Sequence, residues 1–260
     1  MNIPELRTLG GHGARLILDA LAIGETTINR QSAASRLGSS LGSTDQTLRR
    51  LVRSGWLSRA GKGIYLIQPA ELGSEATPDG EAYSRLAVSE PEAVVGYGTA
   101  AFLWNLTTQL RHEIIAVSPK RSWTRELGPV TLRRIQRPVH EISVEVVEKN
   151  VRGCRVRLFS IERTTLDCLH RPDLCGGMDE VAQIVRAASR KWDWAKVTKL
   201  LAASYDTVTR QRLGYFLDRS SNQIPEAFRA WLIESIPKSA RAYLEPGRRG
   251  RYDKIWKVIA

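Results

Sequence analysis

The sequence has 260 residues, 42% of them hydrophobic and 25% charged, and its formal net charge at pH 7 is +12. These values are ordinary for a folded protein of one or two domains and exclude a largely disordered chain. No apolar run approaches the roughly 18 residues of a membrane-spanning helix, and the N-terminus lacks the basic and then apolar order of a signal peptide. We therefore expect a cytoplasmic protein that makes no membrane contact.

The positive charge is concentrated at the two ends of the chain. Residues 1–67 contain 9 basic and 4 acidic residues (net +5), residues 68–160 contain 12 and 11 (net +1), and residues 161–260 contain 18 and 12 (net +6). Basic segments of this kind favour a polyanionic partner, and a basic protein without such a partner is the alternative.

The first 67 residues show the element order of a winged helix-turn-helix. We predict helices over 12–22, 27–37 and 44–54, a turn at 38–42, and a hairpin of strands 56–59 and 64–67 joined by the turn 60–63. The first helix carries apolar residues at Leu16, Leu18, Ala20, Leu21 and Ile23. In the third helix, Leu48, Leu51 and Val52 define one apolar face, and Ser43 or Thr44 is expected to cap the N-terminus.

The rest of the chain predicts a mixed middle and a helical end. We expect helices over 81–88 and 99–106, strands over 114–117, 130–135, 142–147 and 154–159, and then a helix capped by Ser160. Further helices are expected from Met178 or Asp179 to about Arg190, over 192–203, 206–219 and 225–236, with a last strand over 255–259. The fold class is therefore α+β, with a winged helix-turn-helix at 1–68, a Pro- and Gly-rich linker at 69–80, and an α+β domain at 81–260 whose second half is helical.

The exposed face of the third helix is a candidate for contact with DNA. A single helix fits the major groove, where Arg and Gln side chains hydrogen-bond to base edges, and cations on a wing reach neighbouring phosphates. The candidate residues are Thr44, Gln46, Thr47, Arg49, Arg50 and Arg53 on the helix, and Arg59 and Lys62 beside the wing turn. An ordinary solvated helix face, or a winged helix that binds protein, is the alternative.

A second basic set lies near the C-terminus and is a candidate partner surface. Its members are Arg186, Arg190, Lys191, Lys196, Lys199, Arg248, Arg249 and Arg251. Trp192 and Trp194 interleave with these cations, either to stack single-stranded bases or, as we favour, to pack in the core beneath lysine stems. The GRRGR segment at 247–251 is either a phosphate clamp or a polar turn.

Catalysis and metal binding find little support in the sequence. Ser160, Glu162, Arg163 and Asp167 form an acid-rich helix start, but the chain contains no GxxxxGK[ST], GxSxG or HExxH motif, and Asp167 is expected to pair with Arg163 one helical turn away. The three cysteines (Cys154, Cys168, Cys175) and four histidines (His12, His112, His140, His170) show no metal-ligand spacing. We expect reduced thiols, no metal, no cofactor and no enzymatic activity.

Several segments, taken in order, resemble a known family. These are GKGIYLI, GYGTAAFLWNL, IIAVSPKR, the stretch from Ser160 to Gly177 and the end GRRGRYDKIWKVIA. Together they resemble the AbiEi antitoxins of bacterial type IV toxin–antitoxin systems. The stretch SIERTTLD followed by RPDLCGG is the most specific part, with Ile161 where the family usually has proline.

The resemblance implies a two-part antitoxin of a phage-defence type. Its winged helix would bind inverted repeats in the promoter of its own operon and repress it, and its C-terminal part would counteract a nucleotidyltransferase-like toxin of the AbiEii type, with or without direct contact. Two alternatives stay open: an enzyme that modifies the toxin in an atypical kinase-like manner, and a plain winged-helix transcriptional regulator.

Overall fold

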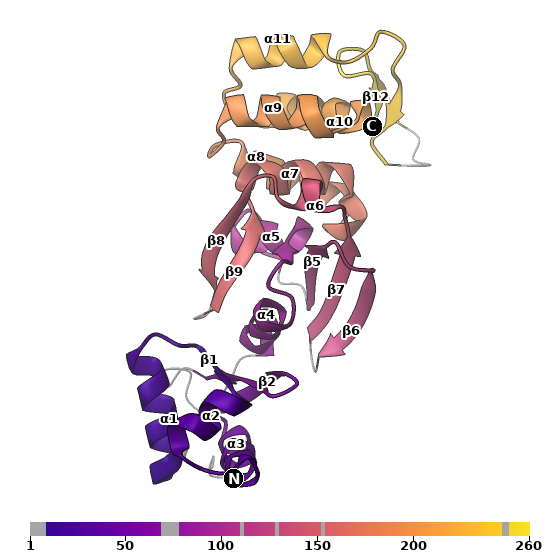
Figure 1. Ribbon diagram of the computed structural model, residues 1–260. Coiled ribbons are helices and arrows are strands. Elements are labelled where there is room, and N and C mark those ends of the chain that lie inside the picture. Colours follow the sequence, from indigo (N-terminus) through magenta and orange to yellow (C-terminus); the bar gives the residue numbers. More distant parts are fainter. Residues whose placement is uncertain (1–8, 69–77, 110–111, 128–129, 152–153, 246–249) are drawn as a thin grey trace, which may run out of the picture. The chain divides into compact units, whose positions relative to one another are not determined.

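The computed structural model describes residues 9–68, 78–109, 112–127, 130–151, 154–245 and 250–260 (Figure 1). The chain divides into two compact units. Unit 1 comprises Met1–Ala93, Ser118–Gln136 and Glu148–Arg157, and unit 2 comprises Val94–Val117, Arg137–Val147 and Leu158–Ala260. The architecture is α+β with a winged helix at the N-terminus and a largely helical C-terminal part, as the sequence predicts. The boundaries 1–68, 69–80 and 81–260 stay a prediction, and residues 69–77 of the expected linker lie outside the described residues.

The helices and strands run in the following order. The N-terminal elements are α1 (Gly11–Ala22), β1 (Thr27–Asn29), α2 (Arg30–Leu37), α3 (Leu41–Arg53), β2 (Leu57–Gly61), β3 (Ile64–Ile67) and α4 (Pro78–Ser89). The middle contains β4 (Val94–Val95), α5 (Tyr97–Leu103), β5 (Glu113–Ser118), β6 (Trp123–Leu127), β7 (Val130–Gln136), α6 (Val139–Ile142), β8 (Val146–Val151) and β9 (Cys154–Phe159). The C-terminal part contains α7 (Ile161–His170), the short 3-10 helix η2 (Pro172–Leu174), α8 (Met178–Ala188), α9 (Trp194–Ser204), α10 (Thr207–Arg219), α11 (Glu226–Glu234), β10 (Ala242–Tyr243), β11 (Tyr252–Asp253) and β12 (Val258–Ile259).

Among the described residues the strands form three sheets. The winged helix contains the order β1-β3-β2, the middle of the chain contains β6-β7-β5-β4-β9-β8, and the C-terminus contains β10-β12-β11. In the wing, β2 and β3 are antiparallel, with Leu57 opposite Ile67 and a register shift between Arg59 and Gly61. The two-residue turn that joins them places Gly63 at a φ of 72°, a conformation that glycine adopts without strain.

The winged helix packs around one apolar cluster. Its buried members are Leu16, Ile17, Ala20, Ile28, Ala33, Leu37, Leu48, Leu51, Leu57, Tyr65 and Ile67. They come from α1, α2, α3 and all three strands of the small sheet, so each element buries one face against the others. In unit 2, α7 has the corresponding central place, because it packs against α5, α8, α9 and α10. Leu166 and Leu169 of α7 are fully buried, as expected.

Three details of the predicted winged helix are wrong. Residues Thr27–Asn29 form strand β1 rather than the start of a helix, because they pair antiparallel with β3, and the Asn29 side chain then caps α2. Helix α3 begins at Leu41 with Ser40 as its N-cap, so the expected cap at Ser43 or Thr44 and the turn ending at residue 42 are displaced. Strand β2 continues through Gly61, inside the expected turn. Of the apolar residues in and directly after α1, Leu16 and Ala20 are buried, whereas Leu18, Leu21 and Ile23 are exposed.

Two predicted strands further along the chain are also wrong in extent. The strand expected over 142–147 begins only at Val146, as β8, because Ile142 is the last residue of helix α6 and Glu145, directly before the strand, has a φ of 52°. At the C-terminus, β12 contains only Val258–Ile259, because the preceding residues turn so that Trp256 is buried against α10. The helix capped by Ser160 is confirmed, since its hydroxyl accepts a hydrogen bond from Arg163 N. In the described parts of the chain, no helix is both long and apolar enough to cross a membrane.

Candidate nucleic-acid interface

Helix α3 carries exposed cations outside its apolar face. Leu48 and Leu51 are buried in the winged-helix core, whereas Gln46, Arg49, Arg50 and Arg53 are exposed. The helix follows α2 after the short turn at residues 38–40, where Gly38 has a φ of 59°. This order and exposure are typical of the recognition helix of a helix-turn-helix, and α3 is called the recognition helix below.

The recognition helix, the start of α2 and the wing line one groove. The groove has a volume of about 640 Å³ and is lined by Asn29, Arg30, Gln31, Asp45, Arg49, Arg59, Gly61, Lys62, Gly63, Ile64 and Tyr65. Of the residues expected to contact DNA, the structure brings Arg49, Arg59 and Lys62 together here. Together with Arg30, the groove has four positive side chains on an open concave surface, which suits a polyanion.

The other expected residues lie elsewhere. Gln46, Arg50 and Arg53 are exposed on the recognition helix but do not line the groove, and Thr47 is half-buried. Arg50 lies beside Gly10, at the start of α1. These positions place the cations of α3 on more than one side of the helix.

Thr44 is not available to a base. It is fully buried, and its hydroxyl donates a hydrogen bond to Ser40 O at 2.9 Å and lies 2.8 Å from Ser39 Oγ. The expectation that Thr44 contacts DNA is therefore wrong. The reason is the earlier start of the helix: with Ser40 as the N-cap, Thr44 lies one turn inside and faces the core, in line with Leu48 and Leu51.

Arg30 is the site residue that sequence inspection missed. As the first residue of α2, it donates bidentate hydrogen bonds to Asp45 on the recognition helix, at 2.7 Å from Nε and 2.6 Å from Nη2. Its backbone N–H also donates to Gly63 O in the wing turn, at 2.8 Å. A signal was present in the chain, because Asn29 is a strong helix cap and marks Arg30 as the first residue of a helix.

The ion pair changes the electrostatics of the groove. The hydrogen bonds from Arg30 lower the pKa of the Asp45 carboxyl, with a further contribution from the charge of Arg49, although desolvation acts in the opposite direction. Asp45 therefore stays ionised at neutral pH, and Arg30 offsets its charge. The carboxylate is left 28% exposed at the groove, where an acceptor suits the amino group of cytosine or adenine.

The C-terminal basic residues have mixed environments. Arg186, Lys191, Lys199 and Arg251 are exposed, whereas Arg248 and Arg249 lie outside the described residues. Lys196 is half-buried and pairs with Glu145 at 3.1 Å, and Arg190 donates to Asn222 Oδ1 at 2.9 Å, so these two carry structural contacts.

The tryptophans beside them belong to an aromatic cluster. Trp192 is buried and packs edge-on against Trp194 with ring centroids 5.3 Å apart, and Trp194 packs against Phe228 at 4.8 Å. This packing favours the core role of the two tryptophans over base stacking.

No metal or disulfide chemistry is evident in the residues that the structure describes. There, no group of three or more His, Cys, Asp or Glu side chains is placed to hold a metal ion. Cys168 and Cys175 are buried thiols that are not disulfide-bonded. Asp167 pairs with Arg163 at 3.4 Å, as its spacing predicts.

Comparisons with known proteins agree with the geometry. Residues 28–68 match a family model described as "Transcriptional regulator, AbiEi antitoxin", which confirms the resemblance to that family over the segment from β1 to β3. The solved structure of the RV2827C protein from Mycobacterium tuberculosis is similar over 97% of this chain and 92% of that chain, with a TM-score of 0.66 and 16% identity. At this identity the likeness shows the fold alone. None of the curated proteins matches the chain. The family match supports a role in transcriptional regulation.

Proposed function

We propose that the protein is an antitoxin that represses its own operon by binding inverted repeats in the promoter and that also opposes a nucleotidyltransferase-like toxin. The groove between the recognition helix and the wing carries the DNA-binding part, because it gathers Arg49, Arg59 and Lys62 beside an exposed helix. The family match over residues 28–68 supports both parts, since its description contains a regulator and an antitoxin.

The interaction with DNA follows from the positions of the charges. The recognition helix lies in the major groove, with Gln46 and Arg49 directed at base edges, and Arg59 and Lys62 of the wing bind the adjacent phosphates. Each good bidentate contact with a base contributes about 1–3 kcal/mol of discrimination. The phosphate contacts add affinity that falls with salt and does not depend on sequence.

The test uses the full-length chain and a duplex from the region upstream of its own gene. Binding of the duplex with the inverted repeat, and of a scrambled duplex, is measured by fluorescence anisotropy over a series of salt concentrations. We expect Arg49→Gln with Arg59→Gln to weaken binding to the repeat about tenfold or more and to lower the salt slope by about one for each lost phosphate contact.

Arg15→Gln is the matched control for lost positive charge. Arg15 lies on α1, its side chain is 67% exposed, and it is absent from the groove lining. This variant should bind like the unchanged protein. Equal affinity for the repeat and the scrambled duplex, or an equal loss in the Arg15 variant, would contradict the proposal.

The antitoxin part is assigned to unit 2. Lys191 and Lys199 are exposed cations on and beside α9, where they suit an acidic surface of a toxin or the nucleic acid that the toxin acts on. Co-expression with the toxin-like product of the neighbouring reading frame tests this assignment through cell growth. We expect Lys191→Glu with Lys199→Glu to lose protection while repression persists, and Arg155→Glu, which changes an exposed cation of unit 1, to protect fully. Full protection by the double variant would contradict the assignment to this surface.

A further inference from the structure

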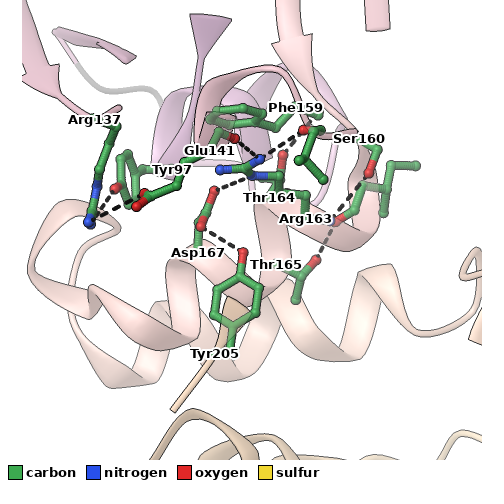
Figure 2. A network of polar contacts seen from close by, with 12 residues as sticks. Tyr97, Arg137, Glu141, Phe159, Ser160, Arg163, Thr164, Thr165, Asp167 and Tyr205 are labelled. Carbon is green, nitrogen blue, oxygen red and sulfur yellow. Dashed lines mark hydrogen bonds and ion pairs between the residues drawn. The ribbon is translucent and has the colours of Figure 1, made fainter. Parts of the chain in front are cut away.

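Unit 2 contains a polar pocket that the proposed function does not use. Its volume is about 410 Å³. It is lined by Tyr97, Val117, Arg137, His140, Glu141, Val144, Phe159, Arg163, Asp167, His170, Ala203, Ser204 and Tyr205. These residues come from α5, β5, α6, β9, α7 and the end of α9 and from the segments beside them, and Figure 2 shows how several of their polar groups face one another. A pocket of this size suits a small molecule, whereas a nucleic-acid chain is too large for it.

One wall of the pocket is rigid. Arg163 donates from Nη1 to the backbone oxygens of Glu141 and Val144, and its guanidinium lies 4.0 Å above the centre of the Phe159 ring. Its Nε also donates to Asp167 Oδ2 at 3.4 Å. Because the guanidinium is held by two carbonyls, a ring and a carboxylate, it is fixed in place before any ligand arrives.

Asp167 is the largely buried acid of this wall, with a side chain that is 13% exposed. Its Oδ1 accepts the hydrogen bond from the Tyr205 hydroxyl that Figure 2 draws, and the two oxygens are 2.7 Å apart. Burial raises the pKa of the Asp167 carboxyl, although the charge of Arg163 and the hydrogen bond from Tyr205 act in the opposite direction. A carboxyl in this environment can accept from a ligand hydroxyl when ionised, and repels an anion little when protonated.

Arg137, on the other wall, is held loosely. Its Nη2 lies 3.4 Å from the Tyr97 hydroxyl, and its Nη1 lies 3.9 Å from the Glu141 carboxylate. For comparison, the bonds between Arg30 and Asp45 measure 2.7 and 2.6 Å. The planar guanidinium of Arg137 therefore has donors directed at the pocket that its protein partners engage only weakly, and such a group suits a phosphate oxygen.

Tyr97 adds an independent sign of a specialised site. It is 2% exposed and has a φ of 53°, which is strained for an aromatic residue. Residues held in this backbone region cluster where function requires a fixed side chain. Here the strained backbone at the start of α5 places the Tyr97 hydroxyl next to Arg137.

The charges on the lining narrow the ligand class. Arg137 and Arg163 supply two positive charges, His140 and His170 add imidazoles, and Glu141 and Asp167 supply acceptors. A ligand that carries only negative charges would be repelled by the carboxyls of Glu141 and Asp167. A neutral molecule would leave Arg137 without a strong hydrogen-bond partner. A molecule with one anionic head and several hydroxyl groups satisfies both sides of the pocket.

We propose that this pocket binds a small phosphate monoester rich in hydroxyl groups, such as a sugar phosphate. Arg137 and the Tyr97 hydroxyl hold the phosphate, and Glu141 and Asp167 accept hydrogen bonds from the hydroxyl groups. The proposal does not depend on DNA binding, because every residue it uses belongs to unit 2.

The test is a calorimetric titration of the full-length protein with ribose 5-phosphate, ribose and inorganic phosphate. We expect one equivalent of ribose 5-phosphate to bind with a Kd of about 1 mM or tighter, and at least tenfold more tightly than either ribose or inorganic phosphate. Arg137→Gln should weaken this binding about tenfold or more. Arg137→Lys keeps the charge but loses the forked donor, and it should bind with intermediate affinity.

Two control variants separate this site from general attraction to a basic protein. Arg155→Gln removes an exposed charge from unit 1, and Arg49→Gln removes one from the DNA groove. Both should bind ribose 5-phosphate within about twofold of the unchanged protein. The proposal is overturned if no saturable binding occurs, if ribose or inorganic phosphate binds as well as ribose 5-phosphate, or if folded Arg137→Lys and Arg137→Gln bind like the unchanged protein.

Discussion

Arg30 and Asp45 form a two-pronged ion pair that connects the first residue of α2 to the recognition helix. The backbone N–H of Arg30 also donates to Gly63 O in the wing turn. One residue thus links the three elements that line the groove. Because the links are a bidentate ion pair and a backbone hydrogen bond, they fix the spacing between wing and recognition helix before DNA arrives.

The first prediction concerns this pair. Asp45→Ala removes a negative charge from the groove and releases Arg30. We expect affinity for a scrambled duplex to rise about threefold to tenfold, and the preference for the repeat to fall, because a base acceptor and the fixed geometry are both lost. Arg30→Ala leaves Asp45 without its partner, and it should weaken binding to both duplexes about tenfold. Anisotropy titrations at constant salt measure both effects.

Arg36→Ala is the control for this experiment. Arg36 also belongs to α2 and also forms an ion pair, with Glu25 at 2.6 Å, but it does not line the groove. The Arg36→Ala variant should bind DNA with an affinity within about twofold of that of the unchanged protein, at a temperature where both proteins are folded. If Asp45→Ala alters neither affinity nor preference, the pair has a structural role only.

The second prediction separates two neighbours on the recognition helix. Thr44→Val should cost about 0.5–1.5 kcal/mol of unfolding free energy, because it removes the hydrogen bonds of the buried Thr44 hydroxyl with Ser40 O and Ser39 Oγ, while the folded variant binds the repeat normally. Gln46→Ala changes an exposed side chain, so it should leave stability within about 0.5 kcal/mol and weaken repeat binding about tenfold. Denaturant unfolding measures the stability of both variants, and DNA titrations measure their affinity for the repeat. The opposite pattern would mean that the register assigned to α3 is wrong.

The third prediction compares two helical glycines. A Cβ at Gly214 of α10 would lie 2.0 Å from Cε3 of Trp256, whose ring is 1% exposed. Gly214→Ala should therefore destabilise the protein by about 1–3 kcal/mol or more, because the ring must move out of its site against α10. Gly42→Ala in α3 meets nothing within 4 Å, and it should stabilise by about 0.5–1 kcal/mol through helix propensity. Thermal unfolding of the Gly214→Ala and Gly42→Ala variants measures both effects. Equal changes in stability would contradict the close packing of Trp256 against Gly214.

The fourth prediction is a dependence of stability on pH. Burial raises the pKa of Asp167 in the folded state above its ordinary value of 3.8. As pH rises from that value, the unfolded chain therefore loses this proton before the folded protein does, so the contribution of Asp167 to stability falls by up to about 1.4 kcal/mol per pH unit until the folded-state pKa is passed. Asp167→Asn cannot ionise, and the stability difference from the unchanged protein should show this decline. If the difference in unfolding free energy between Asp167→Asn and the unchanged protein stays constant as the pH rises above about 4, the pKa of Asp167 is not raised.

The sequence predicted the winged helix well because its signals are local. Apolar residues at helical spacing, a serine cap and a glycine turn fix α1, α3 and the hairpin within a few residues. The same holds for β9 and α7, where strand and cap signals follow each other directly. Strand β1 was missed because three residues carry no usable period, and only its pairing with β3 makes it a strand.

The residues of the candidate DNA interface were predicted in part. Exposed cations on the recognition helix and wing were predicted from the sequence, because opposite faces of an amphipathic helix differ in residue type. Thr44 was misplaced because the predicted helix starts at that residue, whereas α3 begins at Leu41 and Thr44 lies one turn before Leu48 on the same buried face.

The linear order of residues was sufficient to identify the winged helix, its positive face and the resemblance to a family of regulators, because each of these depends on neighbours within about a turn of helix or a hairpin. Folding alone decided which residues meet. The contact of Arg30 with Asp45 joins residues 15 positions apart, and that of Tyr205 with Asp167 joins residues 38 apart. Such pairs form only when separate elements pack, and no pattern in the chain records the packing that brings them within hydrogen-bond distance.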